Sequence, residues 1–194
     1  MLTVYIDFNS PSAYLAMAPT LALATRHELE SDWRPFRTVE RDVPRRGQEE
    51  TVGESHRRVR AAALREEAIK YARHQGITLA YPSELGSTDL ALGILATWTG
   101  DRLPFIQAAF RAYWQDHANL DDPNTIAQIL ADLGQPAEIS KAEVSEALDL
   151  ALDHADEVGI VGAPGYVIQD QIFVGREHLP WIEDLIVTAG AAKA

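Results

Sequence analysis

Asp7-Phe8-Asn9-Ser10-Pro11 is the stretch that decides the fold, because it changes the chain from strand to helix within five residues. The run before it, Thr3–Phe8, is short, β-branched and aromatic, which predicts a buried strand. Ser10 is a favoured N-cap, and Pro11 suits the first helical position, where an N–H would have no partner. Leu29–Phe36 reads as the next strand. These residues therefore predict a β-α-β unit with a crossover helix.

The middle of the chain, from about residue 54 to residue 159, is helical in its pattern of apolar residues. Ser140 begins a capping-box sequence with Glu143, and Asp122-Pro123 marks another helix start. Gly76, Gly134 and Gly159 stand where helix ends favour a left-handed residue. The pattern predicts five helices, at Ser55–Gln75, Thr88–Thr99, Pro104–His117, Pro123–Leu133 and Lys141–Glu157.

Strand signals return after Gly159. Gly165–Gln169 and Gln171–Val174 read as a hairpin with a polar turn, and a last helix is expected over His178–Ala189. The predicted fold class is α/β, with one sheet domain interrupted by a large all-helical insertion. We expect residues 1–50 and 159–194 to form the sheet domain and residues 51–158 to form the insertion.

Composition and charge narrow the class of function. The chain has 194 residues and a formal net charge of −12, which argues against general binding of nucleic acid. Eleven of the seventeen Lys and Arg residues nevertheless lie between Arg34 and Arg73, as a solvated helix face or as a local field that attracts a small anion. No apolar run is long enough to span a membrane and no leader precedes the first strand, so we expect a cytoplasmic protein.

The absence of cysteine limits the chemistry that the chain can carry. Disulfide scaffolds, thiolate metal sites and redox catalysis by a protein thiol are excluded. The six histidines show no helical i, i+4 pairing with a nearby glutamate, so no metal site is expected.

Two places remain as candidates for chemistry. Ser10 stands at a predicted helix N-terminus, where free N–H groups and the helix dipole stabilise an anion, although an isolated Ser there is usually a plain N-cap. The second place is Gly162-Ala163-Pro164-Gly165, where a proline between glycines precedes a strand and makes a cis peptide bond a candidate. A cis bond would leave the N–H and C=O of Ala163 free to pair with an extended peptide.

Several motifs in order along the chain carry a family resemblance. Asp7-Phe8-Asn9-Ser10-Pro11 with Tyr14-Leu15-Ala16 resembles the opening of the 2-hydroxychromene-2-carboxylate isomerases and kappa-class glutathione transferases. Further matching segments are Trp33-Arg34-Pro35-Phe36, Leu64-Arg65-Glu66-Glu67, Ala112-Tyr113-Trp114, Gly159-Ile160-Val161-Gly162-Ala163-Pro164 and Gly175 with Leu179. The resemblance covers nearly the whole chain and implies a DsbA-like thioredoxin fold with a helical insertion.

The resemblance also implies a cofactor and residues that hold it. Ser10 matches the serine that binds the thiolate of glutathione, with Asn9 beside it, and Ala163 before Pro164 matches the residue that pairs with the cysteinyl part. Glu177 occupies the acidic position for the γ-glutamyl amine, with Arg176 as its neighbour. Ser87 stands at the position of a family asparagine, and Gly93 at that of an arginine. The implied reaction is glutathione-dependent isomerisation or transfer on an anionic aromatic substrate, by a chain that is commonly a homodimer in this family.

Two alternatives stay open. The same scaffold can serve an enzyme with another cofactor or an unrelated substrate. It can also serve a non-catalytic binding or interaction protein that keeps the proline groove for a peptide. A closed pocket between sheet and insertion favours an enzyme, and a shallow open groove favours the binding protein.

Overall fold

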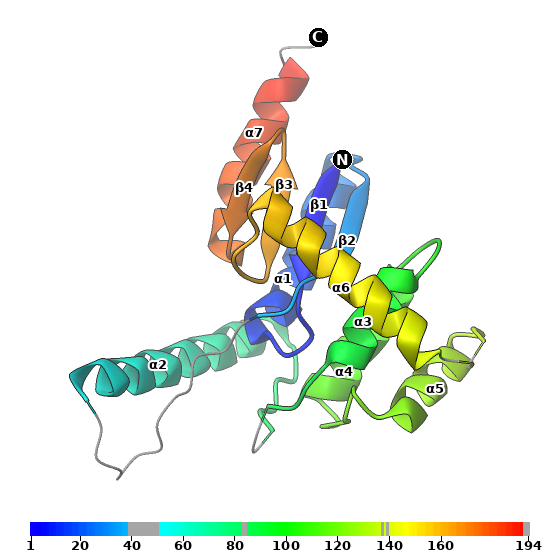
Figure 1. Ribbon diagram of the computed structural model, residues 1–194. Helices are drawn as coiled ribbons and strands as arrows, with labels where there is room; N and C mark the ends of the chain where they lie inside the picture. The colour runs from blue at the N-terminus through cyan, green and yellow to red at the C-terminus, as the bar shows by residue number, and fades with distance from the viewer. Residues whose placement is uncertain (39–50, 83–84, 137, 139, 192–194) are drawn as a thin grey trace. The chain divides into compact units, whose positions relative to one another are not determined.

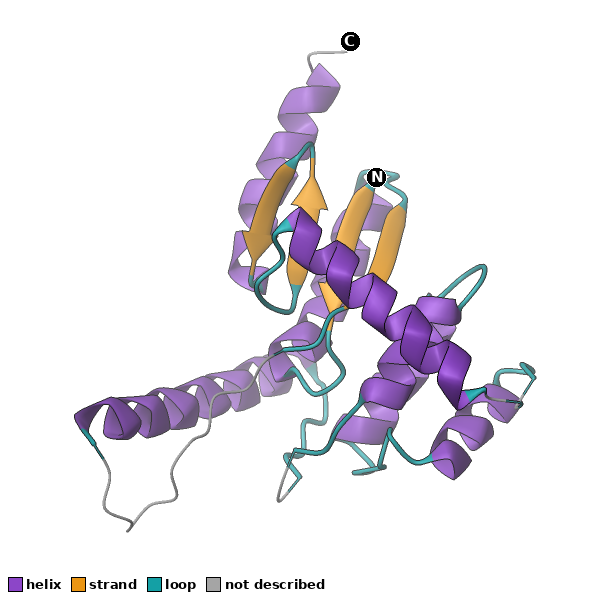
Figure 2. Ribbon diagram, viewed as in Figure 1, coloured by secondary structure: helices purple, strands orange, loops and turns teal. Residues whose placement is uncertain are grey.

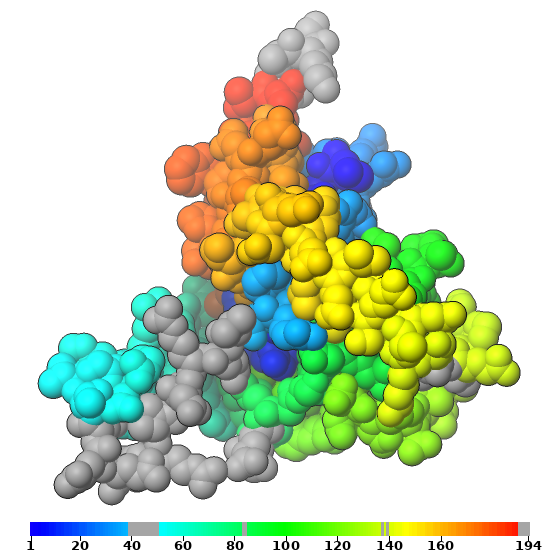
Figure 3. Space-filling model, viewed as in Figure 1, coloured from blue at the N-terminus to red at the C-terminus, as the bar shows by residue number. Residues whose placement is uncertain are grey.

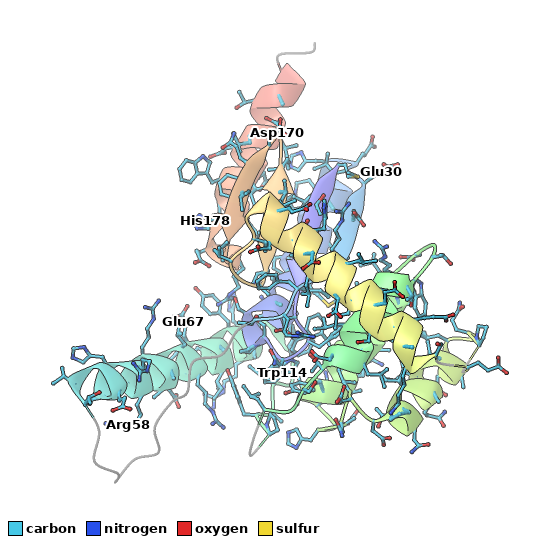
Figure 4. The ribbon with its side chains drawn as sticks, in the orientation of Figure 1. Glu30, Arg58, Glu67, Trp114, Asp170 and His178 are labelled. Carbon is cyan, nitrogen blue, oxygen red and sulfur yellow. The ribbon has the colours of Figure 1, made fainter. Side chains whose placement is uncertain are left out.

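A four-stranded mixed sheet forms the centre of the protein. The computed structural model describes residues 1–38, 51–82, 85–136, 138 and 140–191. The strand order is β2-β1-β3-β4 (Figure 2). β1 (Leu2–Ile6) runs parallel to β2 (Ser31–Pro35) and antiparallel to β3 (Gly165–Ile168), which pairs with β4 (Gln171–Val174) as a hairpin. Asp170, labelled in Figure 4, lies at the hairpin tip, where it and Gln169 have positive φ.

The two faces of the sheet are covered by different helices (Figure 1). On one face lie α1 (Pro11–Arg26) and α7 (Leu179–Ala191), where Thr20 of α1 hydrogen-bonds with Tyr166 of β3. On the opposite face α6 (Lys141–Val158) crosses the strands and packs Ala155 against Tyr5. Because successive side chains of a strand point to opposite faces, Val4 and Tyr5 serve different layers of the core.

Three of the helices between β2 and α6 extend the core beyond the sheet. They are α3 (Asp89–Thr97), α4 (Leu103–Trp114) and α5 (Pro123–Asp132). A Cβ at Gly93 of α3 would lie 2.3 Å from Val144 Cγ1 and 2.6 Å from the Val144 carbonyl oxygen, so α3 and α6 touch backbone to side chain at this point. Figure 3 shows α6 as a continuous ridge over the strands and the α3 region.

The chain divides into two compact units, residues 1–38 with 80–194 and residues 39–79. The second unit contains α2 (Val52–Gln75), which begins with a reciprocal capping box between Thr51 and Glu54 and ends at the left-handed Gly76. The division into a sheet domain and an insertion domain, with boundaries at residues 50/51 and 158/159, remains a prediction.

Most predicted helix ends agree with the structure to within a few residues. Ser10, Asp122 and Ser140 are N-caps whose side chains accept backbone N–H groups. Gly134 and Gly159 have φ of 68° and 91°, as predicted for helix ends. β1 is shorter than predicted, ending at Ile6, because the Asp7 carboxylate begins a turn by accepting the N–H of Asn9. The last helix starts later than expected, after a 3₁₀ turn at Arg176–His178.

None of the helices in the described part of the chain is long and apolar enough to cross a membrane. The basic stretch between Arg34 and Arg73 includes Arg41, Arg45 and Arg46, which lie outside the described residues. Residues 192–194 at the end of the chain also lie outside them.

Candidate functional site

Ser10 lies at the N-terminus of α1, and its side chain takes part in two hydrogen bonds. Its Oγ accepts the backbone N–H of Ala13 at 3.2 Å, which caps the helix, and donates to the carbonyl oxygen of Ala163 at 3.0 Å. The side chain is nearly buried, with 9% exposure. Ser10 is therefore the predicted N-cap, and the same hydroxyl joins the start of α1 to the loop before β3.

The Ala163–Pro164 peptide bond is cis, and the loop that carries it is held closely on both sides. The N–H of Gly175 donates to the Pro164 carbonyl at 2.8 Å. A Cβ at Gly162 would lie 2.9 Å from Val174 Cγ1, so the loop comes close to the end of β4. The expectation that both polar groups of Ala163 are free is wrong for the carbonyl, because Ser10 donates to it. Among the described residues, no acceptor pairs with the Ala163 N–H.

Asp7 is a fully buried carboxylate three residues before Ser10. Its Oδ2 accepts the N–H of Thr38 at 2.7 Å, and its Oδ1 accepts the N–H of Asn9 at 3.2 Å and the hydroxyl of Thr88 at 3.3 Å. Burial raises the pKa of Asp7, and the hydrogen bonds to its oxygens oppose that shift. One side chain therefore ties the Ser10 turn to the end of β2 and the start of α3.

Phe8 and Trp114 connect the turn that carries Ser10 to α4. Trp114 Nε1 donates to the Phe8 carbonyl at 2.9 Å, and both side chains are fully buried. The Phe8 ring packs edge-on against Phe105 and Phe110. Trp114 is labelled on α4 in Figure 4. The backbone on which Ser10 sits is consequently fixed by α4 as well as by β1.

Arg176 and Glu177 follow β4 and lie near the buried hydroxyl of Tyr166. Burial raises the pKa of Tyr166 strongly, its hydrogen bond with Thr20 opposes this, and the charges of Glu177 and Arg176 act in opposite directions. A Cβ at Gly175 would lie within 2.3–2.5 Å of the Glu177 carboxyl group, so that group folds back over the glycine. Both residues are thus at the end of the β3–β4 hairpin, whose Gly175 also contacts Pro164.

Of the remaining predicted residues, Asn9 lies directly before Ser10, whereas Ser87 lies just before α3. Ser87 Oγ accepts the N–H of Asp89 at 3.2 Å, which leaves the Thr88 hydroxyl free to bind Asp7. Ser87 also lines a cavity of about 350 Å³ with Tyr113, His117 and Asp121. Asn9 donates its backbone N–H to Asp7. The structure therefore brings Ser10, Ala163 and Pro164 together, while no described contact joins Ser87 to them.

Sequence reasoning missed the supporting role of Asp7, although its position at the end of an apolar strand was a usable signal. It also missed Thr88 and Trp114, whose contacts with the turn are 81 and 106 residues apart in the sequence. Nothing in their local pattern distinguishes them from an ordinary helix start and an ordinary core tryptophan.

The sheet is interrupted by helices between β2 and β3, and the serine at the start of α1 faces a cis-proline loop. These features define a thioredoxin-like protein, here without a redox cysteine. The family model described as DSBA-like thioredoxin domain matches residues 1–187. The chain belongs to this family, and the predicted DsbA-like fold is confirmed.

Known proteins give the same picture. The chain is 26% identical to the 2-hydroxychromene-2-carboxylate isomerase of Sphingobium xenophagum over 94% of this chain and 96% of that protein. A solved 2-hydroxychromene-2-carboxylate isomerase superposes with a TM-score of 0.79 at 20% identity, covering 99% of this chain and 97% of that one. A probable DsbA oxidoreductase from Streptomyces coelicolor superposes with a TM-score of 0.72 at 19% identity, covering 98% and 89%. The predicted resemblance to the isomerases is therefore confirmed.

Proposed function

We propose that this protein is a glutathione-dependent isomerase acting on an anionic aromatic carboxylate of the 2-hydroxychromene-2-carboxylate type. The observation that carries the proposal is the hydrogen bond from Ser10 to Ala163, which places a hydroxyl at a helix N-terminus beside the cis-proline loop. The similarity to a 2-hydroxychromene-2-carboxylate isomerase along almost the whole chain supports the substrate class.

The residues at this place fit a glutathione thiolate. The N-terminus of α1 presents the positive end of a helix dipole, worth about 0.3–1 kcal/mol to a nearby anion. The half-buried Ala163 has an N–H without an acceptor among the described residues, and this group suits the backbone carbonyl of an extended peptide. Bound glutathione would supply the thiol nucleophile that the cysteine-free chain lacks, adding to a conjugated carbonyl compound and leaving after bond rotation.

Ser10 acts here as a donor that can change partners. Its single proton now goes to the neutral Ala163 carbonyl, while Ala13 continues to donate to its oxygen. Turning that proton toward a thiolate replaces a neutral hydrogen bond with a charge-assisted one, which is roughly twice as strong. The hydroxyl would therefore favour the ionised cofactor without losing the helix cap.

Calorimetric titration of glutathione into the wild type and Ser10→Ala, followed by isomerisation assays with 2-hydroxychromene-2-carboxylate, tests this proposal. We expect saturable binding and a turnover that depends on glutathione, with a loss of about a hundredfold in kcat in Ser10→Ala. S-methylglutathione, which cannot form a thiolate, should bind without supporting turnover.

Stability must be measured beside activity, because Ser10 is also a helix cap. Loss of an N-cap to Ala costs about 1 kcal/mol, whereas replacement by Gly costs only a few tenths. Ser10→Gly is therefore the matched variant: it should lose turnover like Ser10→Ala while keeping a melting temperature closer to the wild type. Absence of glutathione binding, or full activity in Ser10→Gly, would show that the proposal is wrong.

Binding of glutathione without turnover of any aromatic carboxylate would instead favour the non-catalytic alternative. The missing protein thiol leads us to infer that disulfide exchange is not the activity, although family relatives include oxidoreductases. Incubation with a reduced and an oxidised test peptide should show no change in peptide redox state.

A further inference from the structure

A second cavity, of about 330 Å³, lies over the outer strand of the sheet. It is lined from β2 by Asp32, Arg34 and Pro35, from α6 by Ala151 and His154, and by Ala96 and Arg102 at either end of the α3–α4 connection. Neither Ser10 nor Ala163 lines it. A volume of this size is within the range of small-molecule pockets.

The charged groups of this cavity leave a surplus of positive charge. Asp32 stands between two arginines, accepting Arg34 Nε on Oδ2 at 2.6 Å and Arg102 Nη1 on Oδ1 at 2.6 Å. The two guanidinium groups and one carboxylate sum to +1 with His154 neutral. The three side chains are only 23–34% exposed, so their charges are screened less than surface charges. The chain as a whole has a formal net charge of −12.

Arg102 is held in a way that leaves part of its guanidinium for another acceptor. Both of its hydrogen bonds, to Asp32 and to the Trp33 carbonyl at 3.2 Å, use Nη1. Its Nε is buried and has no partner among the described residues. An unpaired buried donor destabilises the fold, and a guanidinium binds a carboxylate best through two nitrogens at once. A small shift of Arg102 would meet both conditions with an incoming carboxylate.

The other residues that line the cavity indicate the charge and polarity of the rest of the ligand. Pro35, Ala96 and Ala151 are apolar, and His154, about half exposed, stands near Glu157 at 4.0 Å. The acidic Glu157 and the internal Asp32 both oppose a second negative charge on the ligand. A ligand with one charge and an apolar body therefore fits better than inorganic phosphate or a dicarboxylate.

We propose that this cavity binds a small organic monocarboxylate with an apolar body, at a place separate from the Ser10 site. The carboxylate pairs with Arg102 and Arg34, and the apolar body lies against Pro35, Ala96 and Ala151. This binding does not depend on glutathione.

Benzoate is the probe, with neutral benzamide as its matched control. Titration of the full chain, followed by amide NMR shifts, should show saturable benzoate binding with shifts at Ala96 and Ala151. Arg102→Gln should weaken that binding about tenfold, and Arg111→Gln on the exposed side of α4 should leave it unchanged. Asp32→Asn removes the internal competitor and should tighten the binding several-fold.

The opposite signs for Arg102→Gln and Asp32→Asn keep the test decisive. If the Arg102–Asp32 pair only joins α4 to β2, both variants lower the melting temperature and neither changes benzoate affinity, which would overturn the proposal. Equal binding of benzamide would also overturn it. Ser10→Ala should bind benzoate like the wild type, so failure of the glutathione proposal and failure of this one are separate results.

Discussion

The buried carboxylate of Asp7 holds the turn that carries Ser10 in place. Its carboxylate is the common acceptor for three donors, from Thr38, Asn9 and Thr88, and it lies directly before the turn that carries Ser10. Because burial raises its pKa, the folded chain keeps the Asp7 proton at pH values where the unfolded chain has lost it.

The pH dependence of stability follows from that raised pKa. Below the ordinary value of 3.8 the carboxyl is protonated in both states, and its contribution to stability is fully present. As the pH rises through the higher pKa of the folded state, the contribution is lost. We expect the unfolding free energy of the wild type minus that of Asp7→Asn to fall as the pH rises above 3.8.

Urea unfolding of both chains at several pH values measures this difference, and the remaining carboxylates cancel because both chains share them. A difference that grows with pH would contradict the direction of the shift. It would mean that the hydrogen bonds to Asp7 outweigh its burial.

At the scale of elements, the contact between α3 and α6 depends on a missing side chain. The family resemblance implies an arginine at the position of Gly93, but the crossing helix leaves no space there for even a Cβ. In this chain the position therefore serves packing between α3 and α6.

Gly93→Ala should destabilise the fold by about 1–3 kcal/mol, the usual cost of an overpacked core. Gly86→Ala is the control, because none of the described residues lies within 4 Å of a Cβ at that position. Denaturant unfolding of the two variants makes the comparison. Equal stability would show that α3 and α6 can separate without cost.

At the scale of the whole molecule, a ligand that binds only the folded state raises its stability by mass action. At a glutathione concentration about a hundredfold above Kd the gain is about 2.7 kcal/mol, which for a chain of this length is about 5–10 °C in melting temperature. We expect this rise in the wild type and a smaller one in Ser10→Ala. A melting temperature independent of glutathione would contradict the proposed cofactor. Light scattering during the same series tests the homodimer that the family resemblance implies as possible.

Much of the architecture follows from local sequence signals for where helices begin and end. Three helices begin where the side chain of Ser10, Asp122 or Ser140 accepts a free backbone N–H within three residues. Pro11 and Pro123 follow the first two caps, and Gly159 ends a helix because glycine tolerates positive φ. Such contacts need no distant partner. Together with the order of strands and helices, they determined the fold class and the position of Ser10 at a helix start.

Only the tertiary structure decided which distant residues meet. Ser10 and Ala163 are 153 residues apart, and their hydrogen bond turns an ordinary N-cap into part of a candidate site. Arg102 likewise joins the local Asp32–Arg34 pair, 70 residues earlier in the chain, only because the start of α4 lies against β2. Local sequence cannot predict such pairs, because the free energy that brings them together comes from burying the apolar faces of whole elements, and the polar groups follow.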